Sequence, residues 1–132
     1  MKAVLITLLF IAGSITGMAQ TQQELNQKAG KEYKAADKKL NTIYQEILKK
    51  YAANKPFINK FKAAQKLWIQ FRDAQLEAMY PGPVQSYGSI LPMCESQYLT
   101  ELTTQRTEAI RVWLNGLPGE LCTGSIGRVT EE

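Results

Sequence analysis

The sequence contains no histidine and only two cysteines, Cys94 and Cys122, among its 132 residues. Histidine is the commonest general base and the commonest metal ligand, so its absence argues against both kinds of site. The cysteines do not form a Cys-x-x-Cys pair, which argues against thiol–disulfide exchange. No serine has a Gly-x-Ser-x-Gly context, and no pair of carboxylates is placed for glycoside hydrolysis. We therefore expect a non-enzymatic protein with no cofactor and no metal site.

The sequence also lacks strand patterns and, after its start, any long apolar run. No stretch alternates with a period of two for the length of a strand, and no later segment is apolar enough to span a membrane. The 16 basic residues exceed the 12 acidic ones, for a formal net charge of +4, but the two signs are interleaved. This pattern does not predict nucleic-acid binding, although a mild positive charge suits an anionic polymer such as cell-wall material.

The start of the chain has the pattern of a cleaved signal peptide. Lys2 is followed by an almost uninterrupted apolar run over residues 3–12, which is too short to span a bilayer comfortably. Gly17 and Ala19 are small residues placed before the polar Gln20. We expect removal of residues 1–19 and a periplasmic or secreted mature chain that begins at Gln20. An uncleaved N-terminal anchor helix is the alternative.

Apolar residues at alternating spacings of three and four predict three long helices. The first is expected over residues 21–52, with Thr21 and Glu24 as a capping box. The second is expected over residues 54–80, with Asn54 as its N-cap, and the third over residues 89–115, followed by a stop at Gly116.

The short connections between these helices favour an all-α, antiparallel three-helix bundle. We expect one helical domain over residues 20–116, followed by an irregular tail over residues 117–132. The three apolar stripes need one another to leave water, so they predict a common core. Its expected members are Leu40, Ile43, Ile47, Phe61, Trp68, Phe71, Leu102, Ile110 and Trp113.

One segment of the second helix has a pattern that composition does not explain. It reads Gln-x-x-Trp-x-x-Phe-Arg-Asp from Gln65 to Asp73, and Arg106-Thr107 follows on the third helix. Together with residues 32–41 and 88–90, this order of features resembles the LprI-like lysozyme-inhibitor family over about residues 22–114. The resemblance implies a small exported helical protein of the bacterial envelope, without enzymatic activity. Lysozyme, the partner of the founding member, is the partner it implies.

The cysteines depart from this family's pattern. Its members usually carry cysteines at the positions of Lys28 and Tyr98, and often one near Gln75, and this chain has none of them. An even number of cysteines in an exported protein more often forms disulfides than free thiols. We therefore predict a Cys94–Cys122 disulfide that ties the tail to the start of the third helix. Whether the bond forms within one chain or between chains stays open.

Two interpretations are open for the charged residues of the family segment. Trp68 lies on the apolar stripe and is expected in the core, whereas Arg72 and Asp73 flank that stripe. Arg106 has a similar place on the third helix, between Leu102 and Ile110. These charges either brace the second and third helices as a polar network or form an anion-recognising surface.

Two classes of partner are open: a lysozyme, or an anionic component of the envelope. The loop over residues 80–88 carries Tyr80 and Tyr87, which can anchor a protein interface, and prolines that order it, so it is the expected probe for the groove of a lysozyme. A positive chain gains no electrostatic steering toward a basic lysozyme, however. The alternative is contact with peptidoglycan or another anionic envelope partner through four lysines of the second helix, Lys55, Lys60, Lys62 and Lys66.

Overall fold

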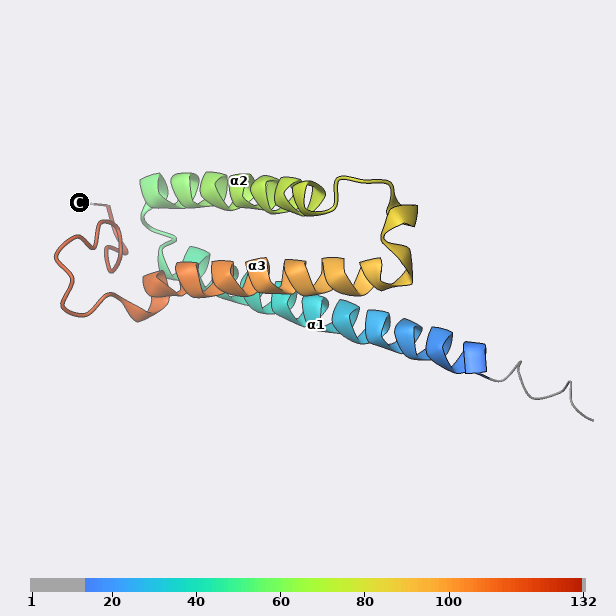
Figure 1. Ribbon diagram of the computed structural model, residues 1–132. Coiled ribbons are helices and arrows are strands. Elements are labelled where there is room, and N and C mark those ends of the chain that lie inside the picture. Colours follow the sequence, from blue (N-terminus) through green and yellow to red (C-terminus); the bar gives the residue numbers. More distant parts are fainter. Residues whose placement is uncertain (1–13, 132) are drawn as a thin grey trace, which may run out of the picture.

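The structure, a computed structural model, describes residues 14–131, with side chains from residue 21 onward (Figure 1). It contains three long helices, α1 (Ser14–Lys50), α2 (Lys55–Met79) and α3 (Leu91–Asn115). Two short 3₁₀ turns, η1 (Val84–Ser86) and η2 (Gly88–Ile90), lie between α2 and α3. No strand occurs over residues 14–131, so the all-helical prediction is confirmed for this range.

The start of α1 differs from the prediction. The helix begins at Ser14 and runs through Thr21, so the proposed capping box lies inside it and does not start it. Residues 1–13, which hold the apolar run of the predicted signal peptide, lie outside the described residues. Cleavage before Gln20 therefore stays a prediction.

The other helix ends follow local chemistry. Asn54 caps α2 as predicted, because its side-chain oxygen accepts a hydrogen bond from the Phe57 N–H at 3.1 Å. Gly116 ends α3 with a φ of 78°, a conformation that favours glycine, and its N–H donates to the Val112 carbonyl. The third helix, expected from residue 89, begins two residues later, since Ser89 lies in η2 and α3 begins at Leu91.

α1 and α3 run parallel and form the closest helix pair of the structure. At one end Asn26 donates to the Ser89 carbonyl at 2.9 Å, and at the other Lys50 Nζ donates to the carbonyls of Trp113 and Leu114. Small side chains allow this close approach, because the buried Thr103 and Thr107 occupy little width on the inner face of α3.

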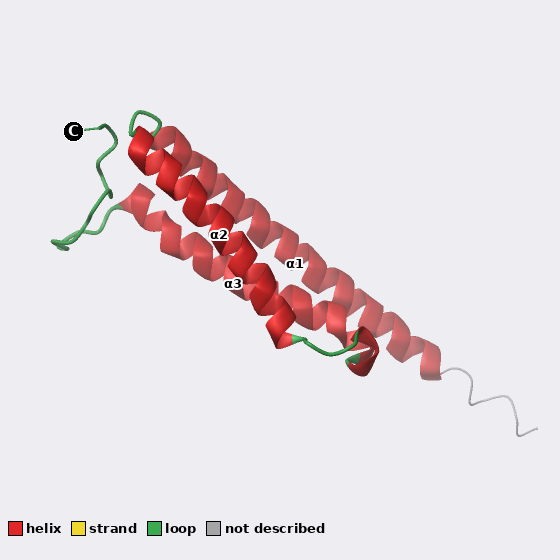
Figure 2. Ribbon diagram, turned by 90° about the horizontal axis from the view of Figure 1, so that it is seen from above, coloured by secondary structure: helices red, strands yellow, loops and turns green. Residues whose placement is uncertain are grey.

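α2 runs in the opposite direction and lies over the α1–α3 pair (Figures 1 and 2). It approaches α3 less closely than α1 does, because aromatic rings separate the helices. Phe61 stacks on Tyr44 of α1 at 5.4 Å and contacts Trp113 of α3 at 5.3 Å between ring centroids. Phe57 joins the same layer by contacting Tyr51. The core is therefore a layer of rings at the end of the molecule where α1 joins α2.

Most of the predicted core residues are confirmed, and one is wrong. Leu40, Ile43, Ile47, Phe61 and Ile110 are buried, and Trp68 and Trp113 pack against them while partly exposed. Leu102 is of intermediate exposure. Phe71 is 62% exposed, because α2 turns only one face toward the other helices and Phe71 lies on the flank of that face. Phe71 does lie in a helix and on its apolar stripe, as its spacing predicted, but the other helices bury only part of that stripe.

The C-terminal tail is irregular, as predicted, but it docks on the helices. Trp113 Nε1 donates to Ser125 Oγ at 3.1 Å, and the Gly127 N–H donates to the Tyr51 hydroxyl at 2.8 Å. The Asn54 side chain donates to the Arg128 carbonyl at 2.9 Å. The tail thus covers the connection between α1 and α2 (Figure 2).

Asn54 joins a helix cap to the tail, so its replacement by alanine is expected to lower the free energy of unfolding by about 1–2 kcal/mol. The expected loss exceeds that of a simple exposed cap, because the bond to the Arg128 carbonyl disappears with it. Chemical denaturation measures the change. Asn41→Ala is the matched control, since the exposed Asn41 lies inside α1 and bonds only to Asp37 one turn away among the described residues. Equal stability of the two variants would contradict this account of the cap.

Candidate functional site

Arg72 of α2 lies in a polar cluster between α1 and α2. Its guanidinium pairs with Asp73 at 2.7 Å and approaches Asp37 of α1 at 3.9 Å, while only 12% of the side chain is exposed. Burial raises the pKa of Tyr33, whose hydroxyl also interacts with Arg72. The charge of Arg72 is therefore matched by two carboxylates, and the structure favours the bracing interpretation for Arg72 and Asp73.

Arg106 of α3 has a different environment. Its Nε donates to the side-chain oxygen of Gln65, a residue that is only 6% exposed, at 3.0 Å. Within residues 21–131, no carboxylate lies within ion-pair distance of Arg106. Burial lowers the pKa of this guanidinium, which still keeps its charge at neutral pH. Arg106 is thus a partly buried cation whose only hydrogen-bond partner in this range is a neutral amide.

Trp68 joins the two arginines. The guanidinium carbon of Arg72 lies 5.4 Å from the centre of its ring, and that of Arg106 lies 5.8 Å from it. Both distances are within the range of cation–π contacts, which orient a guanidinium and hold its stem. Trp68 therefore has a packing role and also fixes the two charges.

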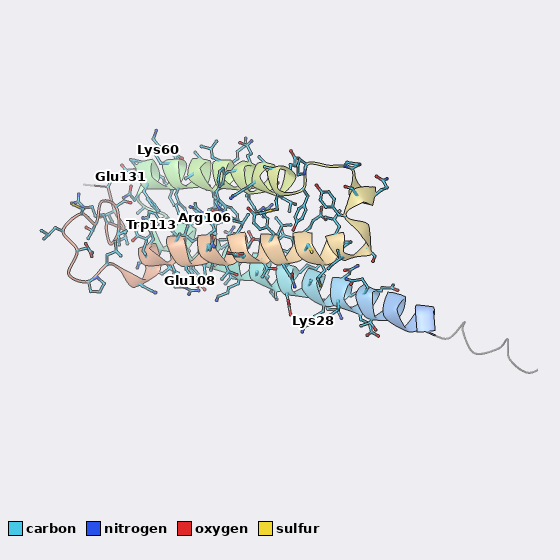
Figure 3. The ribbon with its side chains drawn as sticks, viewed as in Figure 1. Lys28, Lys60, Arg106, Glu108, Trp113 and Glu131 are labelled. Carbon is cyan, nitrogen blue, oxygen red and sulfur yellow. The ribbon has the colours of Figure 1, made fainter. Side chains whose placement is uncertain are left out.

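An open groove of about 320 Å³ follows the line between α2 and α3, and we call it the seam. The residues that line it are, on α2, Trp68, Phe71, Arg72 and Gln75 and, on α3, Leu102, Gln105, Arg106 and Ala109. Figure 3 shows Arg106 on the side of α3 that faces α2, whereas Glu108 lies on the other side of α3. The seam thus combines apolar walls with one unmatched positive charge.

The connection over residues 80–88, here called the tip loop, is held by its own two tyrosines. Tyr80 and Tyr87 meet edge to face with ring centroids 5.5 Å apart, and the Tyr87 hydroxyl accepts a hydrogen bond from the Gly82 N–H at 2.9 Å. Both side chains are of intermediate exposure, and burial raises the pKa of Tyr80. The large apolar side chain that the loop exposes is Val84, at 66%. The tyrosines therefore shape the loop, and Val84 lies at its surface.

Removing the Tyr87 hydroxyl with Tyr87→Phe is expected to loosen the tip loop without unfolding the helices. The Gly82 N–H loses its acceptor, but the site is exposed, so the stability loss stays within about 1 kcal/mol. Amide hydrogen exchange at Gly82 should become several-fold faster while helical circular dichroism is unchanged. Tyr44→Phe is the control, because it removes a hydroxyl from α1, where the Tyr44 ring stacks on Phe61 and not on the loop. Unchanged exchange at Gly82 would show that this bond does not order the loop.

The predicted Cys94–Cys122 disulfide is not present, and both cysteines are free thiols in the structure. Cys94 lies 21 residues before the end of α3, a rise of roughly 32 Å. Even fully extended, the chain from Asn115 to Cys122 reaches back only about 24 Å, and a disulfide needs Cα atoms within about 7 Å. The prediction of this bond within one chain is therefore corrected: the tail leaves from the wrong end of α3 to return to Cys94.

Of the four lysines predicted to bind an anionic polymer, Lys60 does not share the face of the other three. At 100° per residue, Lys60 lies on the opposite flank of α2 from Lys62 and Lys66. Lys55 turns toward the end of α1, where its Nζ donates to the Ala52 carbonyl at 2.9 Å. A larger hollow, of about 710 Å³, is lined only by residues of α1, and its lysines alternate with Asp37 and Glu46. The hollow on α1 therefore does not concentrate positive charge, whereas Lys62 and Lys66 share one flank of α2 with the position of Lys55.

Sequence reasoning did not single out Gln65 and Asp37 as parts of this arrangement. Gln65 belongs to the family segment and lies one turn before Trp68, and this signal was available. Asp37 lies among the interleaved charges of the first predicted helix, and nothing in its spacing predicted that it pairs with Arg72 of α2. Over residues 14–131 no helix is long and apolar enough to cross a membrane, and no group of histidine, cysteine and acidic residues is placed to hold a metal ion.

Comparison with known proteins agrees with the resemblance seen in the sequence. A protein of Rhizobium meliloti (strain 1021), itself described as uncharacterized, is 34% identical over 104 residues, which cover 70% of this chain and 73% of the relative. No solved structure matches this chain. Residues 15–110 match the family described as Lysozyme inhibitor LprI, and this range contains α2, the tip loop and both arginines of the seam. The chain belongs to the LprI lysozyme inhibitor family.

Proposed function

We propose that this chain is an exported, non-enzymatic protein of the bacterial envelope that inhibits lysozyme. Family membership supports a protein partner of this class. The absence of histidine from the sequence supports a function without acid–base catalysis. The apolar run before Gln20 supports export.

The shape of the tip loop is the observation that carries this proposal. Glycoside hydrolases cleave their substrates between two carboxyl groups, and in a lysozyme these lie in a cleft. A protein that blocks such a cleft needs an accessible element, and the tip loop lies at the end of the molecule where α2 connects to α3, beside α1, whose first turns continue past it (Figure 1). Its Pro81, Pro83 and the Tyr80–Tyr87 contact order it before binding, which lowers the entropy cost of association.

The charge of the loop is also compatible with this partner. Residues 80–90 contain no charged side chain, so the loop neither repels a basic lysozyme nor places a carboxylate beside its catalytic acids. The positive net charge of the whole chain disfavours electrostatic steering toward a basic protein. Because the contact surface is neutral, this repulsion acts during approach and not within the contact itself.

Calorimetric titration of the chain beginning at Gln20 into lysozyme tests the proposal. We expect saturable binding that is lost when a non-hydrolysed oligosaccharide already fills the cleft of the lysozyme. Binding that persists with the cleft filled would place the contact elsewhere on the enzyme. Binding to isolated peptidoglycan, with none to lysozyme, would replace this function by the envelope-polymer alternative.

Salt provides a further expected result. Because the tip loop is uncharged, the affinity for lysozyme should change less than about threefold between low and moderate ionic strength. Repeating the titration at two salt concentrations measures this. A steep loss of affinity with added salt would show that lysines, and not the tip loop, make the contact.

A further inference from the structure

The seam has features that a blocked lysozyme cleft does not require. It is a groove, so it receives a projecting element, whereas a cleft-blocking surface must itself enter the cleft. Arg106 lines it and has no carboxylate partner in the described part of the chain. Burying a cation without a partner costs free energy, and an opposite charge beside it offsets part of that cost. Arg72, one helix away, shows the matched case, with two carboxylates nearby.

The hydrogen-bonding groups of the seam are left ready for a ligand. Arg106 uses Nε for Gln65, and over residues 21–131 its two terminal nitrogens donate no hydrogen bond. These two nitrogens form part of the planar fork that binds a carboxylate. The neighbouring Gln75, also in the seam, has a buried side-chain oxygen without a partner in this range.

The apolar wall of the seam continues onto the outer flank of α2. Leu67 and Phe71 are 64% and 62% exposed, and they lie one turn apart. Ala74 and Ala78 continue the same stripe at helical spacing and are exposed as well. Two large apolar side chains followed by two small ones form a surface on which a second helix can lie closely. This length of apolar surface suits a protein segment better than a small molecule.

We propose that the seam binds an acidic amphipathic segment of a partner protein, which places a carboxylate on Arg106 and apolar side chains on Leu67 and Phe71. This interaction is separate from the tip loop and does not depend on the proposed inhibition of lysozyme. The charge of Arg106 selects an acidic segment over a neutral or basic one. The two surfaces allow one chain to hold an envelope protein while its loop contacts a second partner.

A labelled peptide tests the proposal with the chain that begins at Gln20. The probe is a two-heptad helix that repeats Glu-Ala-Leu-Leu-Glu-Ala-Leu, and its matched control has glutamine in place of each glutamate. Fluorescence anisotropy should show that the acidic peptide binds at least about tenfold more tightly than the control. The difference should shrink as salt rises. Equal binding of the two peptides would overturn the proposal.

Variants of the chain identify the surface. Arg106→Gln should weaken binding of the acidic peptide about tenfold or more and remove its preference over the control peptide. Phe71→Ser should weaken both peptides alike, because it removes an apolar contact. Arg111→Gln is the matched control, since Arg111 lies on the same helix but pairs with Glu108, and it should bind as wild type. Wild-type binding by Arg106→Gln would overturn the proposal.

Further measurements check that each variant is folded and that no second copy of the chain occupies the seam. Helical circular dichroism and thermal unfolding of each variant show that the fold persists, and Arg106→Lys keeps the charge if Arg106→Gln unfolds. Sedimentation of the chain without peptide shows whether a second copy fills the seam. Self-association that Phe71→Ser and Arg106→Gln both abolish would replace the acidic partner with another copy of this chain. Lysozyme binding by Arg106→Gln should stay at the wild-type level, so the two proposals fail independently.

Discussion

Replacing Tyr51 with alanine is expected to lower the free energy of unfolding by about 3–5 kcal/mol, the largest effect of any single substitution in the core. The side chain is fully buried, and its ring lies 4.6 Å from that of Phe57 between centroids. Its hydroxyl donates to the Trp113 carbonyl at 2.9 Å and accepts from the Gly127 N–H at 2.8 Å. One residue thus joins the end of α1 to α2, α3 and the tail. Denaturant unfolding measures the loss.

The conservative variant separates packing from hydrogen bonding. Tyr51→Phe keeps the ring but leaves the Gly127 N–H without its acceptor, at a cost of about 1–3 kcal/mol. Amide exchange at Gly127 should become faster as the tail loosens. Tyr44→Phe is the control, because Tyr44 stacks on Phe61 and its ring is preserved. A loss below about 1 kcal/mol for Tyr51→Ala would contradict the position of this ring in the core.

The second large effect concerns the tip loop. Val84→Asp is expected to weaken lysozyme inhibition by at least about thirtyfold, since truncating an interface anchor typically costs about 2 kcal/mol or more. Aspartate also brings a negative charge toward the catalytic carboxylates of the enzyme, and like charges repel in a cleft that excludes water. The inhibition constant of each purified variant measures the change.

A matched control exists at the other end of the molecule. Leu121 lies in the tail and is 97% exposed, so Leu121→Asp makes a comparable exchange of an apolar for an acidic side chain away from the loop. The inhibition constant of Leu121→Asp should stay within about twofold of wild type, because the Leu121 side chain is part neither of the tip loop nor of the core. If both aspartate variants lose inhibition equally, general charge and not the tip loop explains the effect.

Much of the fold was predictable because it rests on local rules. Helical spacing of apolar residues predicted three helices, and Asn54 and Gly116 predicted two of their ends. Capping and helix termination depend on a few neighbouring atoms, so a sequence window contains the needed information. The prediction that α1 starts at Thr21 was wrong. Thr21 has the chemistry of a cap, but the helix already extends before it, and the residues around Thr21 alone do not show this.

The two arginines of the candidate site were predictable from the sequence, but their partners were not. Arg72 and Arg106 have similar positions beside apolar stripes, yet one has two carboxylates nearby and the other has none in the described range. That difference depends on Asp37, which reaches Arg72 only after α1 and α2 pack together. The exposure of Phe71 likewise depends on how much of α2 the aromatic layer covers. Both facts are tertiary, and spacing along one helix does not contain them.

The central claim is that this chain blocks a lysozyme through the tip loop, and the rate of lysozyme on a soluble oligosaccharide substrate tests it most directly. A soluble substrate removes any effect of the chain binding to cell-wall polymer. We predict that the initial rate falls with increasing chain beginning at Gln20, saturates at one chain per enzyme, and recovers with Val84→Asp but not with Leu121→Asp. An unchanged rate at a large excess of folded chain over lysozyme would contradict the claim.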